Sequence, residues 1–206
     1  METITGRIRS GFATGDLNDV HASLLHPAKL IPAGDIRGKG KGTIIPDAPG
    51  IYGWWFTGAI SGVPLEGTLE QEGYRLLYIG IAPRKPSKNG SESKSTLRKR
   101  IARNHLGSRI GSSTLRRSLA CLLEREMGFN ISRAVKGKLV MPRQQEVELT
   151  NWIISRAALS FMIHAAPWDV EDSLIALGTP RLPLNIEGSN HEFAPQLSIL
   201  RRKRRH

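Results

Sequence analysis

Two runs of β-branched and aromatic residues form the clearest hydrophobic pattern in the first half of the chain. They cover residues 51–56 and 74–81, with Pro49 before the first run and Pro83 after the second. Such side chains suit the pleated, half-buried surface of a sheet, and proline marks its turns. We therefore predict two β-strands. The polar, glycine-containing connection over residues 57–73 predicts an insertion or an extra β-excursion between them.

A helical period follows the second strand. Leu97 and Ile101 lie four residues apart, and Ser95 or Thr96 precedes them as a candidate N-cap, which predicts a helix over residues 96–106. Similar patterns predict a helix over residues 113–127, a short hairpin or loop over 130–141, a helix over 144–156, a strand over 159–164, and a last helix that begins with Asp169 as N-cap and ends near residue 177.

These elements predict an α+β fold with a small, three-stranded, mainly antiparallel sheet flanked by helices. No helix separates the first two strands, so they are expected to pair directly. We expect an N-terminal extension over residues 1–48, a domain over 49–187 and a loosely packed, basic C-terminal tail over 188–206. The extension is predicted to be irregular, apart from a short helix at residues 20–25 and a flexible basic loop at residues 38–42.

Composition narrows the class of protein. The 206 residues are 39% hydrophobic, which is enough to bury a core. No apolar segment approaches the ~18 residues that a membrane-spanning helix needs. The first residues do not show the charged segment followed by an apolar segment that is typical of a signal peptide. Cys121 is the single cysteine, so a disulfide framework and a cysteine zinc site are excluded, and its apolar neighbours predict burial. A cytoplasmic location is expected.

The positive charge is concentrated in two places. The formal net charge is +12, and residues 84–117 contain eleven Lys or Arg against a single acid, Glu92. Residues 201–205 are five consecutive basic residues. A basic segment of this kind is typical of proteins that bind nucleic-acid phosphates. For the C-terminal run alone, a solvated, disordered end is the preferred interpretation.

One basic residue, Arg100, is predicted to point toward the protein interior rather than toward solvent. Arg100 follows Leu97 by three residues and therefore falls on the inward face of its predicted helix. A buried charge is costly unless it is paired or used. Arg100 is thus a candidate functional residue.

The tripeptides Gly50-Ile51-Tyr52 and Tyr78-Ile79-Gly80 are followed in order by Arg100, by Glu171 and by the string Leu182-Pro183-Leu184-Asn185. In this order they resemble the motifs of the GIY-YIG nuclease superfamily. Within that superfamily, the chain is most similar in its organisation to the restriction-type endonucleases. The resemblance implies a metal-dependent endonuclease that hydrolyses phosphodiester bonds in DNA with Mg²⁺ or Mn²⁺. It also implies a restriction or other defence-related role.

The resemblance implies that Arg100 binds the scissile phosphate and that Glu171 is the metal ligand. We expect Glu171 at the second or third position of its helix, where the helix dipole favours the ionised carboxylate. A single carboxylate suits Mg²⁺ when water and phosphate oxygens complete its coordination. A carboxylate that only stabilises the start of a helix is the alternative.

The two tyrosines are implied to act together, with Tyr52 as the base or water-positioning group and Tyr78 as its partner against the phosphate. A phenol can relay a proton when nearby cations lower its pKa. The family often carries a lysine where this chain has Ile81, and Arg84 or Lys85 is a candidate substitute. The alternative is that both tyrosines are ordinary half-buried strand residues.

Two further residues are implied to assist. His105 is a candidate second phosphate donor or proton carrier. Related restriction-type members carry a histidine one helical turn after the arginine; in this chain Asn104 occupies that position and His105 follows it. A capping or surface histidine is the competing interpretation. Asn185 is implied to orient the glutamate or a metal-bound water, and turn chemistry is its alternative.

The basic segment predicts the contacts to nucleic acid. Arg116 and Arg117 are expected outside the apolar stripe of their helix. The predicted contacts are Arg84, Lys85, Arg98, Lys99, Arg103, Arg109, Arg116 and Arg117. The rival functions are a non-catalytic nucleic-acid-binding module of the same fold, and the same chemistry on RNA or on branched or damaged DNA. Duplex cleavage needs two active sites or sequential nicking, so a homodimer is one expected arrangement.

Overall fold

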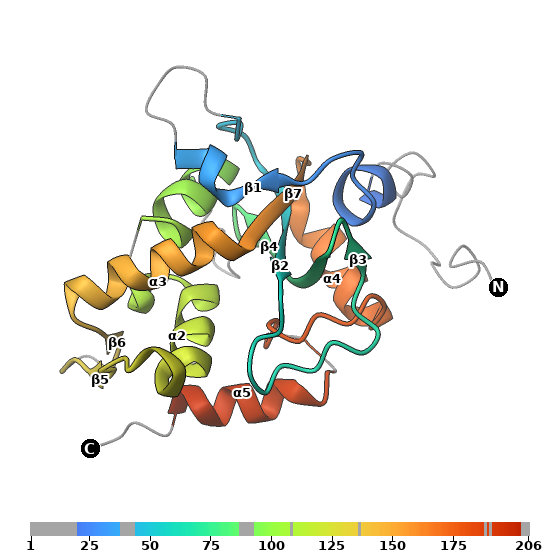
Figure 1. Cartoon of the computed structure of the whole chain (residues 1–206). Coiled ribbons are helices and arrows are strands. Elements are labelled where there is room, and N and C mark those ends of the chain that lie inside the picture. The colour runs from blue at the N-terminus through green and yellow to red at the C-terminus, as the bar shows by residue number, and fades with distance from the viewer. Residues whose placement is uncertain are drawn as a thin grey trace.

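An antiparallel sheet of five strands, in the order β1-β7-β2-β4-β3, forms the centre of the computed structural model (Figure 1). The strands are β1 (Ile31–Pro32), β2 (Gly50–Thr57), β3 (Glu70–Gln71), β4 (Tyr74–Ala82) and β7 (Ala157–Ile163). The structure describes residues 20–37, 44–86, 93–107, 109–135, 137–187, 189 and 191–202.

The three predicted strands are confirmed as the inner strands of this sheet, but the predicted number of strands is wrong. The additional strands are the short edges β1 and β3. β1 comes from the N-terminal segment and pairs with β7, and β3 comes from the connection between the first two strands and pairs with β4. The β-excursion expected in residues 57–73 is therefore present.

Helices cover both faces of the sheet. Figure 1 shows α2 and α3 on one side of β2 and α4 on the other. The helical elements, with π and 3₁₀ segments labelled η, are η2 (His21–Leu25), η3 (Ala33–Arg37), η4 (Lys99–His105), η5 (Ile110–Ser112), α2 (Thr114–Met127), α3 (Arg143–Arg156), α4 (Pro167–Leu177) and α5 (Phe193–Arg202). The predicted hairpin is the pair β5 (Ser132–Arg133) and β6 (Leu139–Val140).

The central strand β2 is buried on both faces because each face has its own core. Trp54 packs into the core under α2 and α3, whereas its neighbour Trp55 packs into the core that contains Leu24 and the α4 residues Val170 and Leu174. Neighbouring side chains on a strand point to opposite faces. A strand between two cores therefore shows a continuous apolar run rather than alternation.

The two tripeptides lie opposite each other in the sheet. Tyr52 on β2 pairs with Gly80 on β4, and a Cβ atom at Gly80 would lie 2.5 Å from the Tyr52 hydroxyl oxygen. The glycine of the second tripeptide is thus required by the tyrosine of the first, since any larger side chain would displace the phenol.

The predicted start of the helix that contains Glu171 differs from the structure. α4 begins at Pro167, with Ala166 as its N-cap, so Asp169 is not the cap. Proline suits the first helical position because that residue needs no hydrogen-bonded N–H. Glu171 is consequently the fifth helical residue, beyond the first turn, and the predicted dipole stabilisation of its carboxylate is wrong.

The loosely packed C-terminal tail is also wrong for residues 193–202. These residues form α5, which packs against α2 and buries Phe193, Ala194 and Leu197. At the other end of the chain, the short helix predicted at residues 20–25 is confirmed as η2. The predicted basic loop over residues 38–42 lies outside the described residues.

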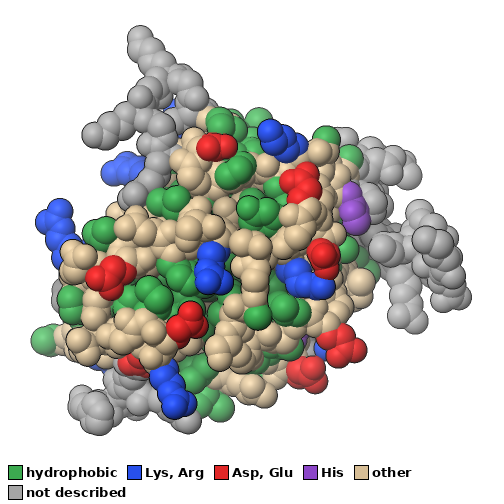
Figure 2. Space-filling view, in the orientation of Figure 1, with side chains coloured by type: hydrophobic (Ala, Val, Ile, Leu, Met, Phe, Trp, Pro, Cys, Tyr) green, Lys and Arg blue, Asp and Glu red, His purple; other side chains and the backbone are tan. Residues whose placement is uncertain are grey.

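The charged side chains on the face seen in Figure 2 are of both signs and are interspersed. The net positive charge of the chain therefore does not form one basic patch on this face. No helix in the described ranges is both long enough and apolar enough to cross a membrane.

Candidate active site

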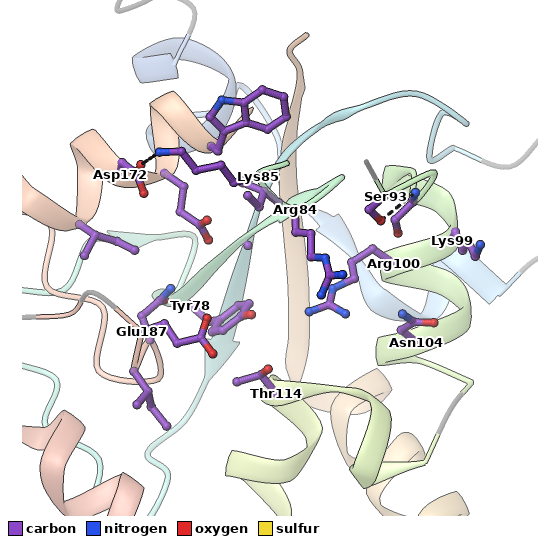
Figure 3. A pocket seen from close by; sticks show the side chains of 18 of the residues that line it. Tyr78, Arg84, Lys85, Ser93, Lys99, Arg100, Asn104, Thr114, Asp172 and Glu187 are labelled. Carbon is purple, nitrogen blue, oxygen red and sulfur yellow. Dashed lines mark hydrogen bonds and ion pairs between the residues drawn. The ribbon is translucent and has the colours of Figure 1, made fainter. Parts of the chain in front are cut away.

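A cleft of about 960 Å³ opens between the second half of β4, helix η4 and helix α4 (Figure 3). Figure 3 shows the side chains of Tyr78, Arg84 and Arg100 pointing toward the middle of this cleft. The predicted site residues that line it are Tyr78, Arg84, Lys85, Lys99, Arg100, Glu171 and Asn185. Segments far apart in the sequence thus bring most of the predicted catalytic residues together.

Arg100 faces the sheet, as the helical pattern predicted. Its Nε donates a hydrogen bond of 3.4 Å to the hydroxyl of Tyr52. None of the ion pairs found among the described residues includes Arg100. The guanidinium is therefore positioned by a neutral partner, and its charge stays available for an anion in the cleft.

A buried chain of hydrogen bonds lies behind Arg100. The Tyr52 hydroxyl lies 2.7 Å from Nε2 of His105, and Nδ1 of His105 lies 2.7 Å from the hydroxyl of Ser113. Burial, together with the charges of Arg100 and Arg116, holds the pKa of His105 well below its usual range. The imidazole is therefore neutral, with one nitrogen as donor and the other as acceptor.

The winding of η4 explains how His105 reaches this position. η4 is a π-type helix, and the N–H of Leu106 donates to the carbonyl of Ile101 five residues earlier. In a π-helix a residue five positions on occupies the place that a residue four positions on takes in an α-helix. His105 thereby lies one turn after Arg100, the place that Asn104 would take in an ordinary α-helix. Asn104 instead lines the cleft.

The expected lowering of the tyrosine pKa values is wrong. Burial raises the pKa of Tyr52 well above its usual range and raises the pKa of Tyr78 to about 12, and in both cases it outweighs the opposing effect of Arg100. Tyr52 is fully buried behind the cleft, whereas Tyr78 lines it. Both phenols are therefore protonated and act as hydrogen-bond partners in the free protein.

Glu171 is a half-buried carboxyl group in the same cleft. Burial, followed by the charges of Asp172 and Glu187, raises the pKa of Glu171 to about 7, and Arg100 lowers it by less. A bound cation would relieve this repulsion, so the residue suits a metal ion. The described residues contain no cluster of three or more His, Cys, Asp or Glu placed to hold a metal. Glu171 would then be the protein ligand, with other oxygens supplied by water and substrate.

Asn185 is held by the backbone rather than by Glu171. Its Oδ1 accepts the N–H of Ile79 at 2.9 Å, and its Nδ2 donates to the carbonyl of Ile79 at 3.0 Å. β3 pairs only with the first two residues of β4, so this edge of Ile79 has no strand partner. Asn185 thus fixes the second tripeptide, while its predicted role in orienting Glu171 or a metal-bound water stays a prediction.

Seven of the eight predicted nucleic-acid contacts fall into three groups. Arg84, Lys85 and Lys99 line the cleft, and Lys85 makes an exposed ion pair of 2.9 Å with Asp172 across its rim. Lys85, but not Arg84, is thus paired with a carboxylate among the described residues. Arg103 and Arg109 are exposed, whereas Arg98 and Arg117 are half-buried and donate to the carbonyls of Ile45 and Gly111.

The predicted outward position of Arg116 is wrong. The side chain is fully buried, forms an ion pair of 2.8 Å with Glu146 and donates to Thr150 and to the carbonyl of His105. The buried surface of α2 extends beyond its apolar stripe, because η5 and α5 pack against it and Arg116 bonds to η4 and α3. A buried arginine in these bonds cannot reach a phosphate, so Arg116 is a structural residue.

The sequence interpretation missed other residues of the cleft, among them Trp168 and Glu187. Trp168 lies three residues before Glu171 on α4, and this helical spacing is the signal that would have placed it beside the glutamate. Glu187 follows Asn185 by two residues in an irregular segment, so no periodic pattern marked it.

The comparisons with known proteins give one match. A family model described as the GIY-YIG catalytic domain matches residues 50–204. No curated protein and no solved structure matched the chain. The matched range contains both tripeptides, every cleft residue described above and helix α5.

Proposed function

The chain belongs to the GIY-YIG catalytic domain family, and from that premise we propose that it is a metal-dependent endonuclease that hydrolyses phosphodiester bonds in DNA. Membership of the family supports nuclease activity, whereas the metal dependence and the DNA substrate are part of the proposal. The observation that carries it is that Tyr78 from β4, Arg100 from η4 and Glu171 from α4 line one cleft.

Arg100 is the proposed ligand of the scissile phosphate. Its guanidinium has no carboxylate ion pair among the described residues, and its planar fork matches two phosphate oxygens. Its half-buried position strengthens the attraction, because water screens the charge less there. The hydrogen bond to Tyr52 holds the group in place before the substrate arrives.

Glu171 is the proposed protein ligand of Mg²⁺ or Mn²⁺. Burial raises the pKa of its carboxyl group first, and the negative charges of Asp172 and Glu187 raise it further; a divalent cation would offset these charges. When bound, such a cation supplies Lewis-acid stabilisation of the transition state and lowers the pKa of a coordinated water.

The tyrosines serve as hydrogen-bond partners in this proposal. Tyr78, at the cleft surface, donates from its hydroxyl to a phosphate oxygen or to the attacking water. Tyr52 lies behind it and, with His105, keeps Arg100 aligned. The high pKa values of both phenols support this division, since a phenolate base would be strongly disfavoured.

Substitution of Arg100 by lysine tests the proposal. The variant keeps the positive charge but loses the fork, so it should bind a DNA duplex nearly as the wild type does. Its cleavage of plasmid DNA in Mg²⁺ should be ~10²–10³-fold slower, the effect of losing one preorganised donor to transition-state charge. Arg103→Lys, on the exposed face of the same helix, is the matched control.

Equal cleavage by the two lysine variants would contradict the proposed role of Arg100. The assay should include duplex DNA, branched DNA and duplex RNA. A wild-type protein that binds these substrates and cuts none would favour the non-catalytic binding module. Cleavage of RNA alone would change the substrate while keeping the chemistry. A restriction or defence-related role and a homodimer stay predictions.

A further inference from the structure

The two helices that border the cleft present different chemistry to it. On the η4 side, the cleft is lined by charged and polar residues, which are Lys99, Arg100 and Asn104. On the α4 side, it is lined by Trp168, Glu171, Asp172, Ile175 and Ala176. Figure 3 shows Asp172 on one side of the cleft and Lys99 and Asn104 on the other. The η4 side therefore suits an anion, whereas the α4 side joins its carboxylates to an apolar surface.

The α4 residues of the cleft share one face of their helix. Trp168 precedes Glu171 by three residues and Ile175 follows it by four, and these spacings place side chains next to one another along a helix. The indole of Trp168 is thus a neighbour of Glu171, the proposed metal ligand, on the face that lines the cleft. A nucleotide bound beside Glu171 would have an aromatic ring within reach on the same side of the cleft.

Trp168 differs from the other three tryptophans of the chain in its surroundings. Trp54, Trp55 and Trp152 are buried, whereas Trp168 is half-buried. Within the part of the chain that the structure describes, Trp168 packs against neither hydrophobic core. An indole has a large apolar surface that a fold normally covers. The part of this ring that stays uncovered faces the cleft, so it is available to a ligand there.

The cleft has room for a base together with its phosphate. Its volume of about 960 Å³ lies at the upper end of the range of small-ligand pockets. Aromatic side chains beside basic residues are the combination with which proteins bind single-stranded nucleic acid, since every base has a flat ring face. In a paired duplex the neighbouring bases cover these faces. A base can therefore stack on Trp168 only when it is unpaired or has left the duplex stack.

We propose that Trp168 is a base-stacking site, which binds an unpaired base next to the scissile phosphate. The cleft then takes branched DNA, or other DNA with an unpaired nucleotide, in preference to a fully paired duplex. The identity of the ligand as DNA rests on the proposed function, whereas stacking does not require cleavage. In this arrangement Arg100 holds the phosphate and Trp168 holds the adjoining base, so the two sides of the cleft bind the two parts of one nucleotide.

The test is binding in EDTA, where cleavage is suppressed, measured by fluorescence anisotropy of labelled DNA. The probes are a forked duplex with unpaired arms, the same fork with abasic sites in its arms, and a fully paired duplex. The abasic fork keeps every phosphate and loses the ring faces. The wild type should bind the abasic fork and the paired duplex ~10-fold more weakly than the intact fork, which is the loss of one stacked base.

Two variants assign this difference to the indole. Trp168→Leu keeps an apolar side chain and removes the aromatic face, so it should bind the intact fork ~10-fold more weakly and should no longer distinguish it from the abasic fork. Trp168→Phe keeps a smaller ring and should lose less affinity. Neither variant should change the affinity for the paired duplex. The comparison of the two forks with the wild type needs no variant.

Intrinsic fluorescence gives a second measurement. Stacking on a base should quench the emission of Trp168, whereas Trp54, Trp55 and Trp152 are buried and cannot contact DNA. Saturating intact fork should therefore lower the emission of the wild type and leave that of Trp168→Phe unchanged. Trp152→Phe is the matched control, because it removes a buried tryptophan that does not line the cleft, and it should keep the quenching.

The inference is overturned if the wild type binds the intact and the abasic fork equally, or if it binds none of the three DNAs. It is also overturned if Trp168→Leu weakens the binding of all three by the same factor, which a purely structural residue would do. Base-dependent binding by a protein that cleaves no DNA in Mg²⁺ would contradict the proposed nuclease function alone. Cleavage by a protein that binds the three DNAs equally would contradict this inference alone.

Discussion

Glu171 carries a carboxyl group whose charged form the fold disfavours. Its pKa is raised from 4.5 to about 7 by burial and by two neighbouring carboxylates. Below about pH 4.5 the group is neutral in both the folded and the unfolded chain and has no effect on stability. As the pH rises toward 7, the unfolded chain ionises first, and the folded state loses stability.

We therefore predict that, in EDTA, Glu171→Gln becomes more stable than the wild type as the pH rises. The Tm values of the two proteins should agree near pH 4.5 and should separate between pH 5 and pH 8, with the variant higher. Each kcal/mol corresponds to ~2–4 °C for a chain of this size. Thermal unfolding followed by circular dichroism measures the difference, and parallel curves would show that the carboxyl group is not desolvated.

The two tyrosines should differ in what their hydroxyl groups support. Tyr52→Phe leaves Nε2 of His105 without its buried partner, so we expect a stability loss of ~1–3 kcal/mol. Tyr78→Phe removes a hydroxyl group at the cleft and should slow cleavage with little loss of stability. Urea unfolding and plasmid cleavage measure the two effects. Equal stability losses in both variants would contradict this division.

Sequence patterns located the candidate site residues that share a motif or a helix face. They failed for residues whose burial and bonding partners are set by a segment distant in the sequence. Arg100 was recognised because Leu97 marks its inward face. Arg116 was not, because its partner Glu146 lies on another helix. The tyrosine pKa values could not be inferred either, since they depend on how completely the surrounding elements exclude water.

At the scale of elements, the buried ion pair between Arg116 and Glu146 connects four segments. Arg116 on α2 binds Glu146 on α3 and the last carbonyl of η4, while Glu146 also accepts the N–H of Ile110 at the start of η5. The pair therefore fixes the end of the π-helix that carries His105. Its contribution is to position the site, because neither side chain lines the cleft.

Glu146→Gln should destabilise the protein by ~3–5 kcal/mol, because it leaves the charge of Arg116 buried and unneutralised. Replacing both residues by methionine should recover much of this loss, since the uncompensated charge is removed with its partner. Denaturant unfolding of the single and double variants measures the coupling. Additive losses would show that the two side chains do not depend on each other.

The inner strands and longer helices were predictable because each shows an extended apolar pattern. β1 and β3 are two residues long, which is too short for any period to be recognised. α5 was missed because Pro195 interrupts its apolar residues, although proline is tolerated in the first turn of a helix. The π-type winding of η4 has no sequence signal of its own, and it decides that His105 rather than Asn104 joins the buried chain.

At the scale of the whole molecule, the sheet separates two cores, and the cleft lies where β4, η4 and α4 meet. β4 contributes Tyr78, η4 contributes Arg100 and α4 contributes Glu171, so the site exists only when both faces of the sheet are covered. The family could be recognised from the order of short motifs, and the same motifs located the candidate site residues. The extent of the ordered chain at its C-terminal end could not, because it depends on the packing of α5 against α2.

The central claim is that this cleft cleaves DNA with a cation held by Glu171, and plasmid cleavage at rising Mg²⁺ concentration tests it most directly. The wild type should nick or linearise the plasmid, EDTA should abolish this, and Glu171→Gln should be at least ~10²-fold slower at every Mg²⁺ concentration while still binding DNA. Asp169→Asn, which removes an exposed carboxylate from the same helix, should cleave at about the wild-type rate. Cleavage by Glu171→Gln at the rate of Asp169→Asn would contradict the claim.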